Sequence, residues 1–302
     1  MNFTTDKSWQ DRIGNQRDWV WRGWQTRYSY LRAKTPGDRY PPIILIHGFG
    51  ASIEHWRNNL PVLAQSYTVY ALDLLGFGAS RKADTEYSAA LWTEQVHDFW
   101  QTFIGVPAIL VGNSIGSLVG LNASVTYPEM VEGLVMINVA DVSVREDLLP
   151  PIARPVVSNI ENLVASPWLI KNILKIVRKP AIIRKWAGLA YPNKAAVSEE
   201  LVAILSNPAY DEGSEKTLFR LTRSIRKASF SQSVRDLLPQ VTAKILLIWG
   251  LQDKMIPPKQ ARAIAKLNPR LKLIELKNAG HCPHDEYPEQ FNSLLLEWLK
   301  SI

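Results

Sequence analysis

The sequence predicts an α/β fold, in which a mostly parallel sheet carries helices on both faces and is interrupted by an inserted helical cap. Strand-like apolar runs alternate with helical patterns over residues 25–138 and again from residue 244 to the end. This alternation is typical of parallel strands joined by crossover helices. The stretch between them is rich in proline and helical patterns and lacks strand alternation. Because sheet elements flank it on both sides, we predict a core formed by residues 1–140 and 241–302, with residues 141–240 inserted as the cap.

Each predicted element follows from its pattern of apolar residues. Short runs rich in aliphatic, β-branched or aromatic residues predict strands at 28–34, 42–47, 67–73, 108–111, 131–139, 244–250 and 271–276. Helical patterns predict helices at 88–104, 115–125, 258–267 and 288–299. The first of these shows the helical period most clearly, because Trp92, Val96, Phe99 and Phe103 recur at intervals of three and four residues.

Composition excludes several classes of protein. A chain of 302 residues, 46% hydrophobic and 21% charged, has the balance of a globular protein with a sizeable core. No apolar run approaches the ~20 residues that span a bilayer, and the first nine residues lack the apolar stretch of a signal peptide. The single cysteine, Cys282, excludes an internal disulfide. No cysteine cluster or zinc-like histidine spacing occurs, so we expect no metal site.

The positive charge is concentrated in the predicted cap. The net charge is +7, and residues 151–240 hold 14 Lys and Arg against 7 Asp and Glu. This one segment therefore carries the whole excess, while the rest of the chain is balanced. Such asymmetry indicates an anionic partner surface.

A serine between two glycines follows the predicted strand 108–111. Gly112-x-Ser114-x-Gly116 has the spacing of a nucleophile elbow, where a strand turns so abruptly into a helix that the serine backbone is strained. A side chain at either glycine would collide with the neighbouring strand or helix. The turn exposes the hydroxyl and leaves the amide of Ile115 at a helix N-terminus, where it can face an oxyanion.

Two further side chains are placed to activate this serine. Asp253 follows the predicted strand 244–250, and His281 follows the predicted strand 271–276. The carboxyl ends of parallel strands meet at one edge of a sheet, where the elbow also emerges. We therefore predict that His281 takes the proton of the Ser114 hydroxyl while Asp253 orients the imidazole.

Other residues near these positions leave alternatives open. Asp141, at the end of the predicted strand 131–139, is a rival to Asp253 as the acid, and His284 is a rival to His281 as the base. The glycine-rich turn of residues 73–80 lacks the register of a phosphate-binding loop and is expected to be structural. The same expectation holds for Cys282, His55 and His97.

The motifs between residues 41 and 298 resemble those of the α/β-hydrolase superfamily, in which serine, acid and histidine follow one another in this order. The resemblance implies an α/β-hydrolase fold and catalysis by Ser114, Asp253 and His281. It also implies that the turn His47-Gly48-Phe49-Gly50 supplies a second oxyanion-hole amide, that of Phe49, beside the amide of Ile115.

A narrower resemblance is to the chlorophyll dephytylase and pheophytinase-like branch of photosynthetic organisms. It is carried by Trp21-Arg22-Gly23, His47-Gly48-Phe49-Gly50-Ala51-Ser52, His55-Trp56-Arg57, Tyr70-Ala71-Leu72-Asp73-Leu74-Leu75-Gly76-Phe77-Gly78, Val111-Gly112-Asn113-Ser114 and Asn207-Pro208-Ala209-Tyr210-Asp211-Glu212-Gly213. It implies hydrolysis of the phytyl ester of a chlorophyll pigment. Ser117 departs from the pattern, which has a second glycine there. We expect this position to pack near the sheet and to crowd the elbow slightly.

One stretch of the cap has the pattern of a basic amphipathic helix. In residues 167–179, Lys171, Lys175 and Arg178 fall on one helical face, and aliphatic residues fall on the other. A helix of this kind that begins with tryptophan can lie in the interface of an anionic membrane. The alternative is a cap helix that packs on the core and leaves its basic face in water.

The predicted function is hydrolysis of a carboxylic ester of an apolar substrate through an acyl-enzyme, without a metal or organic cofactor. The resemblance implies chlorophyll or pheophytin as substrate, no nucleic acid partner, and an intracellular location, either cytoplasmic or peripheral on a thylakoid membrane. One alternative is a carbon–carbon bond hydrolase of vinylogous diketones, which uses the same triad. Another is a non-catalytic binding protein with the same fold. A haloalkane dehalogenase is disfavoured, because its elbow nucleophile is an aspartate.

Overall fold

The computed structural model describes residues 8–34, 40–141, 172, 174–225 and 227–302. Its strands are β1 (Asn15–Trp21), β2 (Trp24–Leu31), β3 (Ile43–Ile46), β4 (Val69–Leu72), β5 (Ala108–Asn113), β6 (Val131–Ile137), β7 (Lys244–Gly250) and β8 (Leu271–Leu276). The helices around the sheet are α1 (Trp9–Arg12), α2 (Leu60–Leu63), α3 (Ala89–Phe103), α4 (Ile115–Thr126), α11 (Val234–Leu237), α12 (Lys259–Ala265), α13 (Pro283–Glu286) and α14 (Pro288–Leu299). Short 3-10 turns are η1 (Ile53–Trp56), η2 (Pro128–Met130), η3 (Lys194–Ala196), η4 (Asn207–Tyr210), η5 (Ala228–Phe230) and η6 (Leu238–Gln240).

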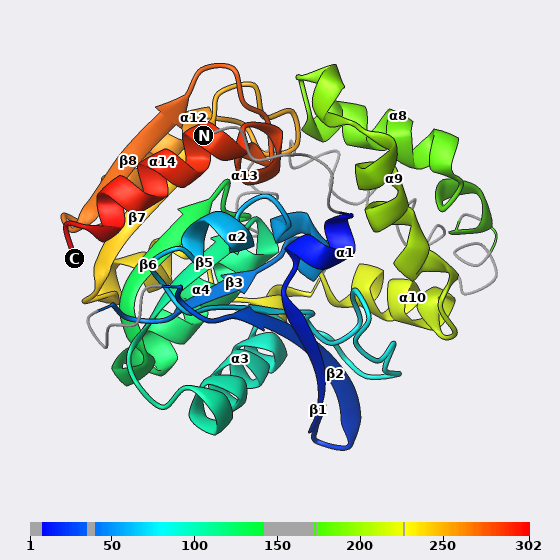
Figure 1. The fold of residues 1–302 in the computed structure, drawn as a ribbon, viewed down its shortest axis with the longest axis horizontal. Helices are drawn as coiled ribbons and strands as arrows, with labels where there is room; N and C mark the ends of the chain where they lie inside the picture. The colour runs from blue at the N-terminus through cyan, green and yellow to red at the C-terminus, as the bar shows by residue number, and fades with distance from the viewer. Residues whose placement is uncertain (1–7, 35–39, 142–171, 173, 226) are drawn as a thin grey trace.

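Within the described residues the strands form one mixed sheet, in the order β1-β2-β4-β3-β5-β6-β7-β8 (Figure 1). The pairs β1–β2 and β2–β4 are antiparallel, and every other pair is parallel. This is the predicted α/β-hydrolase fold, a mostly parallel sheet with a helical insertion. Parallel strands such as β3 coincide with continuous apolar runs of the sequence, because a central parallel strand is buried on both of its faces.

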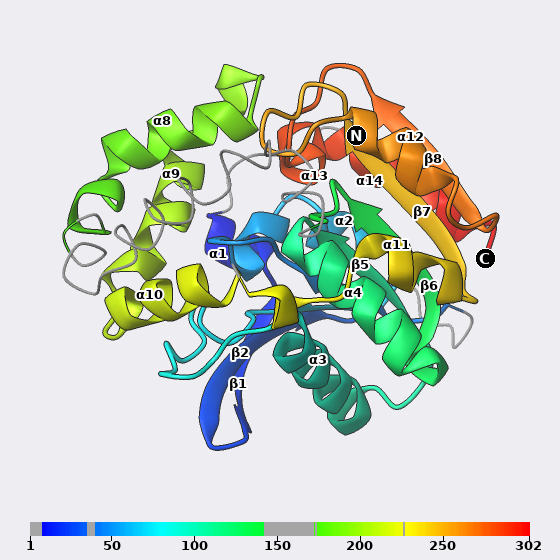
Figure 2. The same cartoon turned by 180° about the vertical axis from the view of Figure 1, so that it is seen from behind.

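The two faces of the sheet carry separate cores. Along β3, Ile44 and Ile46 pack in one apolar cluster, and Ile43 and Leu45 pack in the other, since successive side chains of a strand point to opposite faces. The first cluster includes side chains of α3, α4, α11 and α12, and the second includes those of α2 and α14. Figures 1 and 2 show these helices on the two sides of the sheet.

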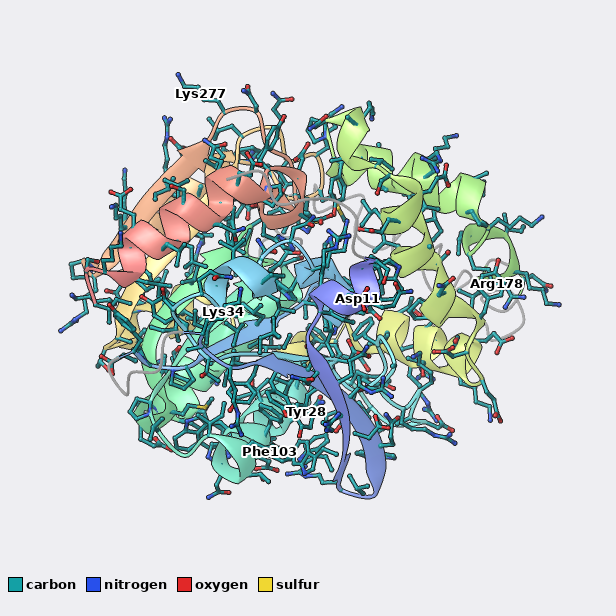
Figure 3. The ribbon with its side chains drawn as sticks, in the orientation of Figure 1. Asp11, Tyr28, Lys34, Phe103, Arg178 and Lys277 are labelled. Carbon is teal, nitrogen blue, oxygen red and sulfur yellow. The ribbon has the colours of Figure 1, made fainter. Side chains whose placement is uncertain are left out.

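The hairpin of β1 and β2 begins earlier than the sequence predicted. Its turn is formed by Arg22 and Gly23, which both have positive φ, 51° and 83°. Two such residues make the tight turn that matches strand twist, but arginine is an uncommon residue for the first position. The hairpin packs its aromatic side chains against α3: the Tyr28 and Phe103 rings lie 5.0 Å apart (Figure 3).

The inserted region contains α8 (Pro180–Ala190), α9 (Glu199–Ser206) and α10 (Ser214–Ser224), which lie together beside the sheet (Figures 1 and 2). A small apolar cluster of its own holds α8 against α9, through Ala187, Leu201 and Val202 among others. α11, by contrast, contributes Val234 and Leu237 to the core under the sheet. The division at residues 140 and 240 stays a prediction.

The predicted amphipathic helix at residues 167–179 falls partly outside the described residues, which leave out 167–171, and with them Lys171, and residue 173. In its described part, Leu174 and Val177 line a cavity beneath the cap. Arg178 lies over the Tyr210 ring, with its guanidinium carbon 4.4 Å from the ring centre. None of the helices described here combines the length and the apolar content needed to cross a bilayer.

Candidate active site

Ser114 stands at the turn between β5 and α4 in a conformation that side chains rarely adopt. Its φ is 55° and its ψ is −113°. The Ser114 amide donates to the Ile137 carbonyl at the end of β6, 2.8 Å away, and this bond fixes the turn to the neighbouring strand. A strained residue held by its surroundings is typical of functional sites.

The two glycines of the motif are required by close approaches of the backbone. A Cβ at Gly112 would lie 2.3 Å from the backbone of Gly116, on the helix side. A Cβ at Gly116 would lie 2.2 Å from the Ile46 carbonyl oxygen, on the strand side. Both distances are far inside van der Waals contact, so the elbow closes only when both residues lack a side chain.

Ser117, where the family pattern has glycine, does pack against the sheet. Its side chain is fully buried, and its Oγ lies 2.6 Å from the Gly112 carbonyl oxygen. The Ile137 amide donates to the same Oγ over 2.9 Å. The expected crowding is therefore offset by hydrogen bonds that link the ends of β5 and β6.

His281 and Asp253 lie in direct contact. Nδ1 of His281 is 2.8 Å from Oδ2 of Asp253, and both side chains are buried. The imidazole Nδ1–H thus donates to the carboxylate of Asp253, on the loop after β7, and this is the acid that the sequence predicted ahead of Asp141. Because Nδ1 is engaged, Nε2 is the nitrogen left to face a hydroxyl.

The Asp253 carboxylate is held by donors on both oxygens. The amides of Met255 and Ile256 donate to Oδ1 at 2.7 and 3.0 Å, and the Asn138 side chain donates to Oδ2 at 2.6 Å. Burial pushes the pKa of Asp253 upward, but the hydrogen bonds from His281, Ile256 and Asn138 outweigh it and hold the pKa below its ordinary value. The carboxylate is therefore kept ionised beside the imidazole.

Ser114 and His281 both line one cavity of about 730 Å³ between the sheet and the cap. The Ser114 hydroxyl makes no hydrogen bond to a described residue, whereas the His281 ring is fixed by Asp253. In proteins without substrate such hydroxyl–imidazole bonds are often long. Most other side chains of the wall are apolar, and these include Leu174, Val177, Ile183, Leu205, Leu218 and Leu221.

The oxyanion hole formed by the amides of Phe49 and Ile115 stays a prediction. Phe49 and Ile115 flank the serine on the loop after β3 and at the start of α4, and neither amide donates to another described residue. His47 supports the first loop: its Nε2 accepts from the Leu74 amide at 3.0 Å, and its Nδ1 lies 2.8 Å from the Gly48 carbonyl oxygen. Burial lowers the pKa of His47 to about 4, so this ring stays neutral.

The cap is bonded directly to the loop that carries His281. The His281 amide donates to the Ala190 carbonyl at the end of α8, over 2.8 Å. The Glu286 carboxylate accepts from Gly280 at 2.6 Å and from Asn193, in the cap, at 2.7 Å. A Cβ at Gly280 would lie 2.2 Å from the Ala190 carbonyl oxygen. Cap and histidine loop thus form one packed unit.

His55, expected to be structural, lines the cavity beside the cap. Its Nε2 lies 2.6 Å from the Tyr191 hydroxyl, which donates to Asp285 over 2.8 Å. His284, the rival base, is fully buried against Trp56 and is not among the lining residues. The hydrogen bond to Asp253 is made by His281.

The remaining candidates make contacts of other kinds. Cys282 lines the cavity, and burial raises the pKa of its thiol well above the ordinary value, which makes it a poor nucleophile. His97 stacks on Tyr127 with ring centres 3.8 Å apart. In the glycine-rich turn, Asp73 accepts from the amides of Ile53 and Ala79, both at 2.7 Å, and so ties two loops together.

Sequence reasoning missed two residues that hold the site. Asn138 has a φ of 46° and bridges Asp253, Gly250 and the Gly280 carbonyl. Its only sequence signal is an asparagine after a strand, a residue that tolerates this conformation. Glu286 gave no signal, because its partners come from loops far apart in the chain.

Comparison with known proteins places this geometry in a family. A model described as "Alpha/beta hydrolase family" matches residues 43–294. A 2-hydroxy-6-oxo-6-(2'-aminophenyl)hexa-2,4-dienoic acid hydrolase of Metapseudomonas resinovorans is 29% identical, over 85% of this chain and 83% of that protein. The chloroplastic pheophytinase of Arabidopsis thaliana is 26% identical over 91% of this chain, and the match spans 64% of the pheophytinase.

A solved structure with the same architecture is that of a serine hydrolase involved in carbazole degradation, the CarC enzyme. It has a TM-score of 0.73 and 25% identity, over 95% of this chain and 99% of that one. The family model covers most of the chain, including the elbow and both loops that carry Asp253 and His281. The chain therefore belongs to the alpha/beta hydrolase family.

Proposed function

We propose that this hydrolase cleaves a carboxylic ester of an apolar substrate, with the phytyl ester of a chlorophyll pigment as its best candidate. The observation that carries the proposal is the cavity of about 730 Å³, in which Ser114 and His281 are the reactive groups in a largely apolar wall. Cavities of ~300–1,000 Å³ enclose most of a drug-sized ligand. Such a space suits a long hydrocarbon chain next to a single polar reacting group.

In the proposed mechanism, the Ser114 hydroxyl attacks the ester carbonyl while Nε2 of His281 takes its proton. Asp253 holds the imidazole in the tautomer that leaves Nε2 free and stabilises the imidazolium. The amides of Phe49 and Ile115 donate to the oxyanion, each worth ~3 kcal/mol of transition-state stabilisation. His281 then protonates the leaving alcohol, and a water molecule activated by the same ring releases the acid.

The pigment assignment is supported by the residues shared with the pheophytinase-like branch and by the pheophytinase among the relatives. In this assignment the phytyl chain occupies the cavity, and the macrocycle stays at the mouth beside Phe49 and Trp186, which line the cavity and remain exposed. The scissile ester would then lie at Ser114, between the two parts.

A second candidate is carbon–carbon bond hydrolysis of a vinylogous diketone. It is favoured by the dienoic acid hydrolase among the relatives. It is also favoured by Arg178, which lines the cavity and could pair with a substrate carboxylate. The same Ser114, His281 and Asp253 would serve both reactions.

The deciding experiment is product analysis by mass spectrometry after incubation with chlorophyll, pheophytin, short acyl esters and a 2-hydroxy-6-oxo-dienoic acid. We expect free phytol from at least one pigment and no cleavage of the dienoic acid. The matched control, Ser114→Ala, loses turnover of every substrate. Cleavage of the dienoic acid alone selects the second candidate, and near wild-type turnover by Ser114→Ala overturns both.

A further inference from the structure

The mouth of the cavity has an apolar rim that faces solvent. Four of its lining residues are also large, exposed apolar residues: Phe49, Trp186, Leu189 and Met255, with 45%, 60%, 45% and 59% of their surface exposed. A residue that both lines a cavity and is exposed must stand at its opening. These four come from the loop after β3, from α8 and from the loop after β7, so three separate parts of the fold build the rim.

α8 continues this rim along its outer side. Ile182, Trp186 and Leu189 are spaced at four and three residues and therefore share one face of the helix. Another face, with Ala187 and Ala190, packs into the small core of the cap. The helix thus has two apolar sides, and only one of them is covered by the cap itself. Large exposed apolar patches on a single chain mark interaction sites.

The charged residues on α8 and just before it are all basic, and one of them, Arg184, pairs with Glu199 of α9. Residues 172–198 contain six Lys and Arg and no Asp or Glu. Lys175, Lys179 and Lys185 are exposed on α8 and just before it, and Lys254 is exposed beside Met255 at the rim. Lysines that flank exposed tryptophan and aliphatic side chains are the pattern of a surface that binds anionic lipid headgroups.

We infer that the exposed side of α8 and the cavity mouth together form a docking face for the surface of an anionic bilayer. Lipid headgroups would contact Lys175, Lys179 and Lys185, while Trp186 and Leu189 would enter the interface. The inference rests on the proposed function in one respect: the bilayer would supply the apolar ester, which then passes from lipid into the cavity without crossing water.

The test is co-sedimentation of the full chain with vesicles of phosphatidylcholine alone or mixed with phosphatidylglycerol. We expect pelleting with the mixed vesicles only, weakened by salt. The variant Lys175→Glu/Lys179→Glu/Lys185→Glu should lower the partition coefficient about tenfold or more. The variant Trp186→Ser/Leu189→Ser should also weaken pelleting, by removing the apolar contribution.

The matched control is Lys266→Glu/Lys272→Glu/Lys300→Glu. It makes the same change of charge at exposed lysines just after α12, in β8 and just after α14. These elements lie on the opposite side of the molecule from α8 and Arg178 (Figures 1 and 3). We expect it to pellet like the wild type. Equal losses in both triple variants, or pelleting with neither vesicle, overturn the docking face. So does a wild-type dimer in light scattering that Trp186→Ser/Leu189→Ser dissociates.

Turnover of a short water-soluble ester separates this inference from the proposed function. The triple variant Lys175→Glu/Lys179→Glu/Lys185→Glu should keep that turnover, because none of these lysines lines the cavity. A chain that pellets as expected but cleaves no ester keeps the docking face and refutes the ester proposal. A chain that cleaves esters but does not pellet with the vesicles refutes the docking face and leaves the ester proposal standing.

Discussion

The position of Ser114 depends on the two neighbouring glycines, Gly112 and Gly116. The Cβ missing at Gly116 leaves room for the carbonyl oxygen of Ile46, and this lets α4 begin directly against β3. Four residues later, Gly120 lies in a different setting. A Cβ there would meet the end of the Leu134 side chain at 3.0 Å, which can move, and Leu110 Cβ at 3.8 Å, an ordinary contact. The close approach of α4 to β3 therefore requires glycine at position 116 but not at position 120.

Gly116→Ala should therefore disrupt the elbow, and Gly120→Ala should be tolerated. We expect Gly116→Ala to unfold several degrees below the wild type and to lose reaction with an organophosphonate probe at Ser114, because the added methyl group must displace backbone. Gly120→Ala should stay within about 1 kcal/mol of the wild type, since alanine favours helix. Thermal unfolding and probe labelling measure both. Equal behaviour of the two variants would contradict this account.

Glu286 should act as a positioning residue for His281. In Glu286→Gln one oxygen remains to accept from the amides of Gly280 and Asn193, so the link between the histidine loop and the cap loses one of its two hydrogen bonds. We expect kcat for a short soluble ester to fall about tenfold or more, because a small displacement of a catalytic group lowers the rate steeply. KM should change little.

The control for this variant is Glu289→Gln, at an exposed position at the start of α14. It should leave kcat and KM at wild-type values. A far-downfield proton signal from the His281–Asp253 hydrogen bond gives a readout that a loss of stability alone does not move. If Glu286→Gln keeps both the signal and kcat, the positioning role is wrong.

The sequence predicted Ser114, Asp253 and His281 because each follows a strand in a family order, and their contacts can be reasoned from topology. Asn138 and Glu286 could not be found in this way. Asn138 contacts the Asp253 side chain as well as backbone groups, and Glu286 contacts the backbone of the histidine loop and of the cap. Which of these segments meet depends on the whole fold. The prediction of His55 as structural missed its place on the cavity wall for the same reason.

At the scale of elements, the cap is held to the core by a buried ion network. The Arg57 guanidinium contacts Glu200 of α9 at 2.5 Å and Asp285 of α13 at 2.8 Å. Arg12 of α1 contacts Glu200 as well, at 2.6 Å. Arg57 and Asp285 are almost fully buried, whereas Glu200 is partly exposed. Two parts of the core, α1 and the end of η1, thus contact α9 of the cap, and α13 supports Arg57 from behind.

Arg57→Met should destabilise the protein by about 3–5 kcal/mol, because it leaves Asp285 buried without its cation. Arg220→Met is the matched control, since Arg220 of α10 also joins the cap to the core, through Asp84, but both partners are exposed. Its expected cost is below about 1 kcal/mol. Urea unfolding measures both. Similar costs for the two variants would show that burial of the pair does not matter.

The sequence predicted some helices and strands more accurately than others. Strands such as β3, with four apolar residues in a row, are buried on both faces and were found within a residue or two. β1 was missed, because most of its residues are exposed or half-buried and its turn places an arginine at positive φ. An edge strand of this kind is specified by its partner more than by its own pattern.

Across the whole molecule, buried neutral histidines make stability depend on pH. Burial lowers the pKa of His55 to about 4 and that of His284 well below its ordinary value of 6.5. As the pH falls below 6.5, the unfolded chain binds protons at these positions and the folded chain does not. The free energy of unfolding contributed by these groups therefore decreases toward acid.

His284→Phe should flatten this dependence. The ring packs against Trp56, His55 and Phe291, and neither of its nitrogens bonds to a described residue. Phenylalanine keeps the ring and removes both the unpaired polar atoms and the proton uptake. We expect equal or greater stability at pH 7 and a gain that grows at pH 5, measured by urea unfolding. His55→Phe, which deprives Tyr191 of a partner, should destabilise at pH 7.

The contact of residues 190–193 with the histidine loop decides where a foreign lid can be transplanted onto this scaffold. The cap backbone at Ala190 can lie against Gly280 only because this residue has no side chain. Glu286 accepts hydrogen bonds from both segments, through the amides of Gly280 and Asn193. A chimera that keeps native residues from Ala190 to Asn193 retains the original seat for His281. A chimera that replaces residues 190–193 places a new backbone against Gly280. It therefore changes the substrate specificity and the position of His281 in the same step.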